Sequence, residues 1–208
     1  MSKIVVKRLG KAAMAVKSCC CVCIVVAIVS CAGFLPASHS KKDLIDNFEK
    51  RTTQILAVRD YFNSIVSNNK SVDIEFSSDT IIARLEVFGL DSVTRRMQFP
   101  VFTKWGLSIQ SPQVDSILHA LHWSQETLIT LKKKLDEANC ISVRNGTPCR
   151  VGFQRSGMGM YFYDLFLTPL SDRLKDTYNN RCSYIFYKPT VVLEYMGGAI
   201  GSQCFPKD

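Results

Sequence analysis

Apolar residues recur every three or four positions along residues 41–68, which predicts an amphipathic helix that ends at the Asn68-Asn69 pair. A second long helix is predicted from Ser111-Pro112 to about Ala138, with proline in the first turn, where a helix tolerates it. Its apolar stripe consists of Val114, Ile117, Leu118, Leu121, Leu128, Leu131 and Leu135.

The rest of the chain is rich in β-branched and aromatic runs, which predict strands. Two predicted strands, residues 72–76 and 80–88, follow the first helix, and residues 105–110 predict another. The last third predicts strands and one short helix (171–178), in the order 140–143, 150–154, 160–167, 171–178, 183–187 and 191–195. Because tight turns join most of these strands, we expect an α+β fold: a mainly antiparallel sheet with two long helices packed on one face.

The beginning of the chain predicts export. A basic segment, residues 1–18, precedes a twelve-residue apolar run, residues 19–30. That length fits a signal peptide and is short of the roughly 20 residues of a membrane span. The four cysteines inside the run are interpreted as small hydrophobic residues: Cys19, Cys20, Cys21 and Cys23. An uncleaved anchor and a soluble secreted protein are the alternatives.

The net charge of +8 could indicate a nucleic-acid binder, but five positive charges and no acidic residue precede Cys31. The remainder therefore carries about +3, which is ordinary, and no nucleic-acid partner is expected. With 47% apolar residues the chain has the composition of a folded protein. We expect a signal peptide at residues 1–30, a lipidated tether at 31–40 and a single α+β domain at 41–208.

Residues 28–31, Ile-Val-Ser-Cys, resemble the lipobox of bacterial lipoproteins. The resemblance implies that Cys31 carries a lipid anchor and that the protein is held at a membrane of the cell envelope, facing the periplasm or the exterior. Ala32 stands where an aspartate would direct retention in the inner membrane, so the outer membrane is favoured. The segments SGMGMYFY, CSYIFYKPTVVLEY and GSQCFP look like small lipoproteins of Bacteroides-type bacteria that have no established activity.

Four cysteines follow Cys31, and an even number in an exported domain predicts disulfides. Three connectivities are open; we favour Cys140–Cys149 and Cys182–Cys204, because each pair closes a local unit. If Asn145-Gly146 is a two-residue hairpin turn, however, Cys140 is only the diagonal neighbour of Cys149, which is marginal for a bridge. That pairing therefore requires a wider loop.

No motif in the sequence predicts a catalytic, metal or cofactor site. His119 and His122 lie three residues apart on the second helix, but they are interpreted as part of an exposed polar face, because the pattern lacks a third ligand. The loop at Arg155-Ser156-Gly157 lacks the lysine of a phosphate-binding loop and is interpreted as a hairpin turn. We expect no metal and no cofactor.

Tyrosine and phenylalanine alternate in the strand at residues 160–167, so Tyr161 and Tyr163 share one face, and Phe162 lies on the other. Exposing a tyrosine to water costs less free energy than exposing a phenylalanine, because the tyrosine hydroxyl can hydrogen-bond to water. We therefore expect Tyr161 and Tyr163 to be exposed and to form a binding face. The predicted function is that of a non-catalytic, lipid-anchored domain that binds a protein or an envelope ligand, for example an immunity or inhibitor protein. The alternative is an envelope hydrolase with a dispersed triad, in which His119 or His122 supplies the base.

Overall fold

The computed structural model describes residues 39–91, 93–94, 96–156, 159–196 and 204–206. From residue 39 onward the described chain clusters as one compact unit. The predicted signal peptide, Cys31 and nearly all of the predicted tether therefore lie outside the described residues.

The domain opens with a long helix, α2 (Lys41–Ile65). Ser40 caps it: its side chain accepts a hydrogen bond from the backbone N–H of Asp43, whose carboxylate in turn accepts one from the backbone N–H of Ser40. Arg51 departs from helical geometry (φ −130°, ψ 26°) and kinks the helix. The residues of α2 that are buried recur at helical spacing: Leu44, Asn47, Phe48, Ile55, Val58 and Phe62.

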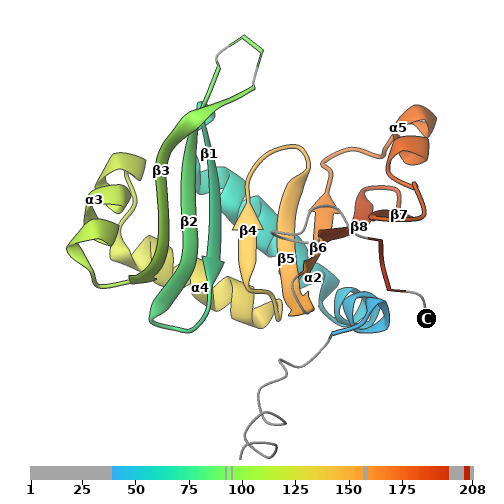
Figure 1. Ribbon diagram of the computed structural model, residues 1–208, viewed down its shortest axis with the longest axis horizontal. Helices are drawn as coiled ribbons and strands as arrows, with labels where there is room; N and C mark the ends of the chain where they lie inside the picture. The colour runs from blue at the N-terminus through green and yellow to red at the C-terminus, as the bar shows by residue number, and fades with distance from the viewer. Residues whose placement is uncertain (1–38, 92, 95, 157–158, 197–203, 207–208) are drawn as a thin grey trace, which may run out of the picture. The chain divides into compact units, whose positions relative to one another are not determined.

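Eight strands form one antiparallel sheet in the order β3-β2-β1-β4-β5-β6-β8-β7 (Figure 1). Their bounds are β1 Lys70–Phe76, β2 Ile81–Leu90, β3 Met97–Ser108, β4 Ser142–Arg144, β5 Cys149–Ser156, β6 Gly159–Leu165, β7 Tyr184–Lys188 and β8 Val191–Met196. The short strand β4 pairs with both β1 and β5. It therefore joins the meander β1–β3 to the four strands β5, β6, β8 and β7. The expected α+β fold with antiparallel sheet is thus confirmed.

The predicted second helix is two helices, α3 (Pro112–Leu121) and α4 (Gln125–Glu137). His122 adopts a left-handed conformation (φ 58°) and ends α3, and Ser124 caps α4 by accepting a hydrogen bond from the N–H of Thr127. Trp123 fills the break: its indole N–H donates to the carbonyl of Ile65 at 2.9 Å, and its ring packs on Phe62. The contact with the end of α2 therefore occupies the point where a continuous helix was expected.

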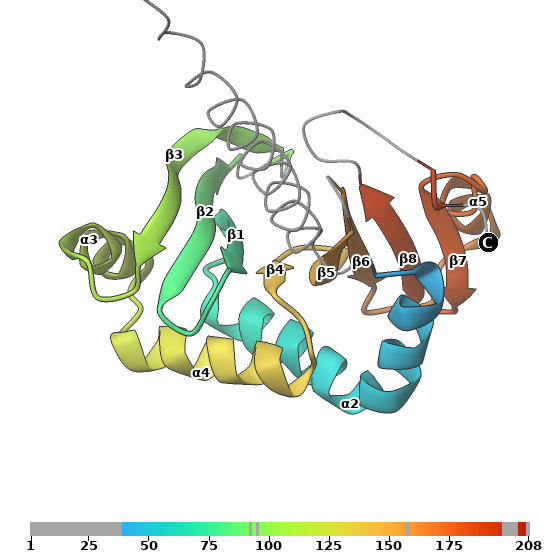
Figure 2. The same cartoon turned by 60° about the horizontal axis from the view of Figure 1, so that its bottom comes forward.

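Helices α2 and α4 lie side by side against one face of the sheet (Figure 2). The main core lies between these helices and the sheet. It includes Leu44, Phe62, Ile74, Leu131 and Tyr163, each at most 1% exposed. Among the described residues, no long helix packs on the opposite face. We call these two sides the helix face and the open face.

A short helix, α5 (Asp172–Thr177), lies beside β7 at one end of the sheet. Here a second, small apolar cluster covers part of the open face and comprises Phe166, Leu170, Val192, Tyr178, Tyr184 and Phe186. The predicted disulfide Cys182–Cys204 is present and fastens the residues before β7 to the end of the chain.

The predicted disulfide Cys140–Cys149 is wrong, because both thiols are free and buried. Ser142 pairs with Gly152 and Arg144 with Arg150, which places Cys149 level with Asn145. Cys140 is five residues from that level, or about 16–17 Å along a strand. The loop at residues 145–148 is indeed wider than a two-residue turn, but its extra length moves the two cysteines further apart, well beyond bridging distance.

Candidate ligand-binding face

The tyrosines predicted to form a binding face lie in the core instead. Tyr161 and Tyr163 share one face of β6, as expected, but both are completely buried on the helix face. The hydroxyl of Tyr163 donates to the carbonyl of Leu44 at 2.8 Å and accepts from the side-chain amide of Asn47 at 3.1 Å. Partners from α2 thus satisfy the hydroxyl of Tyr163, and the ring of Tyr161 stacks on Phe205, so the predicted exposure of both tyrosines is wrong.

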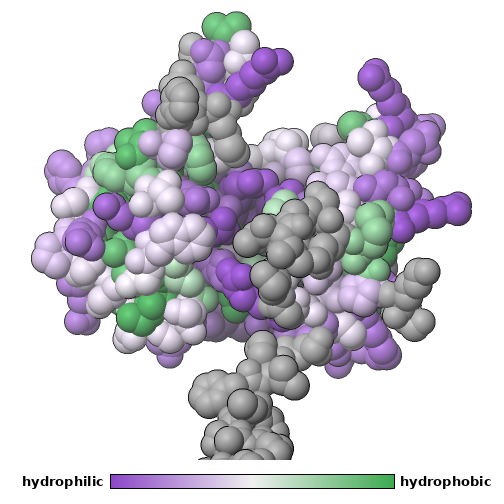
Figure 3. Space-filling model, in the orientation of Figure 1, coloured by the Kyte–Doolittle hydropathy of each residue, from purple (hydrophilic) through white to green (hydrophobic). Residues whose placement is uncertain are grey.

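The open face is charged where the helix face is apolar. On β1, Ser71, Asp73 and Glu75 alternate with three core residues, and cross-strand pairing brings charged residues of five other strands to the same side. These open-face charges are Asp73, Glu75, Arg84, Glu86, Arg144, Arg150, Asp164 and Glu194. Figure 3 shows hydrophilic residues gathered over the middle of this side.

One ion cluster lies on the β1–β2 half of the open face. The Arg84 guanidinium contacts Asp73 at 3.0 Å and Glu86 at 3.3 Å. Glu75, 2% exposed, receives two hydrogen bonds of 2.8 Å from Arg155, which approaches from β5. Burial raises the pKa of Asp73, with Arg84 opposing the shift.

A second ion cluster lies on the β5–β8 half. Arg150 donates to Asp164 at 3.1 Å and contacts Glu194 at 2.8 Å, and both carboxylates are at most 1% exposed. Burial, reinforced by the negative charge of Asp164, raises the pKa of Glu194 to about 7. Burial also raises the pKa of Asp164, and burial with the charge of Glu194 raises that of Tyr184 to about 12. This cluster therefore changes its proton count near neutral pH.

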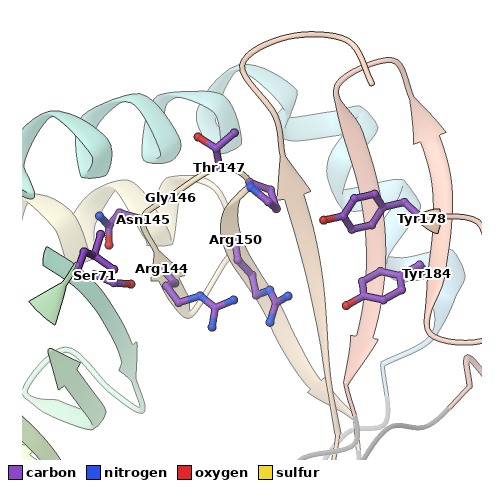
Figure 4. Close-up of a pocket in the computed structure, with 10 residues that line it drawn as sticks. Ser71, Arg144, Asn145, Gly146, Thr147, Arg150, Tyr178 and Tyr184 are labelled. Atoms are coloured by element: carbon purple, nitrogen blue, oxygen red, sulfur yellow. The ribbon is translucent and has the colours of Figure 1, made fainter. Parts of the chain in front are cut away.

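A cavity of about 580 Å³ opens between the two clusters. Its lining comes from β1, the end of β2, the segment from the end of β4 to the start of β5, the end of α5 and the start of β7: Ser71, Leu90, Arg144, Asn145, Gly146, Thr147, Pro148, Arg150, Tyr178 and Tyr184. In Figure 4 both arginine side chains lie between Ser71 and the two tyrosines, whose hydroxyls point toward the arginines. A cavity of this size accommodates a small organic ligand.

The loop that carries the cavity is held in place by Asn145. Its side-chain oxygen accepts from the backbone N–H of Val72 at 2.7 Å, and its amide donates to the carbonyl of Lys70 at 3.0 Å. These two bonds tie the β4–β5 loop to the backbone of β1. They bring Arg144 and Ser71 to the same cavity without a bond between these two side chains.

Two polar groups in the cavity have no partner among the residues that the structure describes. The hydroxyl of Ser71, which is 3% exposed, makes no hydrogen bond. The guanidinium of the half-buried Arg144 forms no hydrogen bond or ion pair there, although its neighbour Arg150 has two carboxylates. Most buried polar groups in proteins are satisfied, so such groups in a cavity indicate a ligand site.

The other residues considered in the sequence do not converge on this cavity. His119 and His122 are exposed at the end of α3, and no group of three potential metal ligands occurs within the described part of the chain. Burial raises the pKa of the Cys149 thiol to about 12 and that of Cys140 further, so both are poor nucleophiles.

No protein-family model, curated protein or solved structure matches this chain. Among the described helices none has the length and apolar character needed to cross a membrane.

Sequence reasoning missed the open-face residues, although the signal was present. Asp73, Glu75, Arg84 and Glu86 alternate with apolar residues in two predicted strands, as expected for a strand with one polar side. What could not be seen in the sequence is that Arg144 and Arg150, six positions apart across a loop, face each other in the register of β4 and β5.

Proposed function

We propose that this protein is a non-catalytic binding domain of the bacterial cell envelope, and that it binds its ligand on the open face. The observation that carries the proposal is the cavity of about 580 Å³ in which Ser71 and Arg144 have no partner among the described residues. Neutralising a toxin, as an immunity or inhibitor protein does, is one form of such binding.

Energetics support a functional interpretation of the open face. Desolvation cancels much of the attraction within a buried ion pair, so replacing such pairs by apolar residues is often neutral or stabilising. Asp164 and Glu194 nevertheless occupy positions where apolar residues would pack, and their pKa values are raised. Perturbed ionisable groups beside a cavity are typical of functional sites.

The cavity supports binding better than hydrolysis. Its lining offers hydroxyls at Ser71 and Thr147 but includes no histidine that could act as their base. His119 and His122, the bases considered from the sequence, lie outside it on α3.

The location is part of the proposal and rests on the lipobox-like residues that end at Cys31. A lipid on this thiol would hold the domain at a membrane. Labelling cells with a radioactive fatty acid tests it: the wild-type chain should be labelled and the Cys31→Ser variant should not. Equal labelling of the two would contradict the lipid anchor.

Hydrogen exchange tests the binding surface. The full chain is compared with and without an extract of the cell envelope of the bacterium that makes it. We expect amide exchange in the β4–β5 loop, at Gly146 and Thr147, to slow in the extract, because a bound ligand covers these exposed residues. The turn between α3 and α4, at His122, is the control and should not change. Absence of protection, or protection confined to the helices, would overturn the proposal.

A further inference from the structure

Resting on the proposed function, we infer that the open-face cavity binds a small organic anion, whose carboxylate or phosphate group is held by Arg144 and Ser71. The existing pairing of the charges around the cavity points to this ligand chemistry.

The described open-face carboxylates near the cavity are already paired with arginines other than Arg144. Asp73 contacts Arg84, and Asp164 and Glu194 share Arg150. These three carboxylates also feel the charge of Arg144, which lowers their pKa values, but none lies within ion-pair distance of it. Arg144 thus remains the cation whose planar donor fork is available to an incoming group.

The geometry of an arginine fork selects an oxyanion. Guanidinium groups bind carboxylates and phosphates through paired N–H bonds, which are stronger than bonds between neutral groups. Ser71 adds a second donor on the same side of the cavity, and its hydroxyl is buried without a partner. A ligand oxygen there would satisfy both groups together.

The rest of the cavity fits a ligand with hydroxyl groups. The rings of Tyr178 and Tyr184 pack edge to face with their centroids 5.3 Å apart, and their hydroxyls point toward the arginines in the cavity (Figure 4). Thr147 contributes another hydroxyl from the loop. A volume of about 580 Å³ leaves room for a ring of sugar size beyond the anionic group.

Calorimetric titration of the full chain in detergent tests the inference with three probes. D-Glucuronate supplies a carboxylate, glucose 6-phosphate a phosphate, and glucose neither. We expect at least one acidic sugar to bind and glucose not to; the preferred one identifies which oxyanion the site selects. Binding of none of the probes, or equal binding of glucose, would overturn the inference.

Variants show whether the proposed residues bind the probe. Arg144→Gln should weaken binding by about tenfold or more, and Ser71→Ala by about threefold to tenfold. Arg144→Lys keeps the charge but loses the fork and should recover only part of the affinity. The matched control is Lys50→Gln, which removes one exposed positive charge from α2 on the opposite face and should bind as the wild type does.

Two results separate this inference from the proposed function. If Arg144→Gln binds an acidic sugar as tightly as the wild type, the anion site is wrong. If an envelope extract still slows exchange at Gly146 and Thr147 in that case, the open face binds a ligand of different chemistry, and the proposed function stands.

Discussion

The helix face and the open face are made of alternate residues of the same strands. Apolar packing against helices stabilises the first, whereas polar and charged side chains form the second. On β1, Val72, Ile74 and Phe76 pack beneath helices, whereas the intervening residues carry hydroxyl or carboxylate groups. On β6, Tyr163 points to one side and Asp164 to the other. Because successive side chains point to opposite sides of a strand, one stretch of sequence serves both purposes.

The difference is one of energy. Full burial of a large apolar side chain contributes roughly 1.5–3 kcal/mol to folding, so the helix face supplies most of the stability. A buried ion pair contributes little net energy, but removing one of its partners is costly. The open face therefore adds little to the free energy of folding. Its charged residues are nevertheless hard to replace one at a time, because each replacement leaves a buried charge without its partner. Such a surface is suited to binding.

The largest expected loss is on the helix face. Tyr163→Ala removes a fully buried ring and should lower the free energy of unfolding by about 3–5 kcal/mol in urea denaturation. Tyr163→Phe keeps the ring but removes the hydroxyl that contacts Leu44 and Asn47, and should cost about 1–3 kcal/mol. Nearly unchanged stability of both variants would refute the assignment of this tyrosine to the core.

The next largest effect tests the ion cluster on the open face. Arg150→Met leaves Asp164 and Glu194 buried without a cation and should cost about 3 kcal/mol or more near pH 8. The loss should shrink near pH 5, because both carboxylates can then take up protons. A loss independent of pH would show that the arginine acts by packing against Phe162 and not by charge.

A smaller, pH-dependent effect is expected for Glu194→Gln. The folded protein holds the Glu194 proton up to about pH 7, above the ordinary range of a glutamate. The folded state thus binds more protons than the unfolded state between those pKa values, and the contribution of Glu194 to stability falls as the pH rises through this window. Urea denaturation across the window should show a shallower decline for the variant. An identical decline would mean that Glu194 does not titrate there.

The smallest effect is expected for an exposed open-face residue. Trp105 is 63% exposed on β3, and the guanidinium of Arg84 lies 5.9 Å from its ring. Trp105→Ala should change the free energy of unfolding by only about 0.5 kcal/mol, measured as above. A loss comparable to that of Tyr163→Ala would erase the contrast between the two faces.

Local patterns predicted most of the elements but not what each side of the sheet contacts. The strands β1, β2, β5, β6 and β8 were predicted to within a few residues because β-branched and aromatic runs mark them. β3 was largely missed, since Pro100 interrupts its pattern; as an edge strand it tolerates proline. The break between α3 and α4 depends on Trp123 reaching α2, a tertiary contact that periodicity does not encode.

The same limit explains the site. Alternation placed Tyr161 and Tyr163 on one side correctly, but which side meets the helices depends on polar partners such as Asn47, 116 residues away from Tyr163. Arg144 was not singled out because its importance lies in the absence of a partner among the described residues. Only the arrangement of Arg84 and Arg150 around the carboxylates reveals it.

The most direct test of the division between the two faces is the stability of the double variant Ser71→Ala, Arg144→Gln. Neither side chain forms a hydrogen bond or an ion pair with the described residues, so the double variant breaks no such contact, and removing an unsatisfied hydroxyl relieves its desolvation. Urea denaturation should give a free energy of unfolding equal to that of the wild type within about 0.5 kcal/mol, or higher. A loss of about 2 kcal/mol or more would show that these residues support the fold, and would contradict the conclusion that the open face is kept for binding.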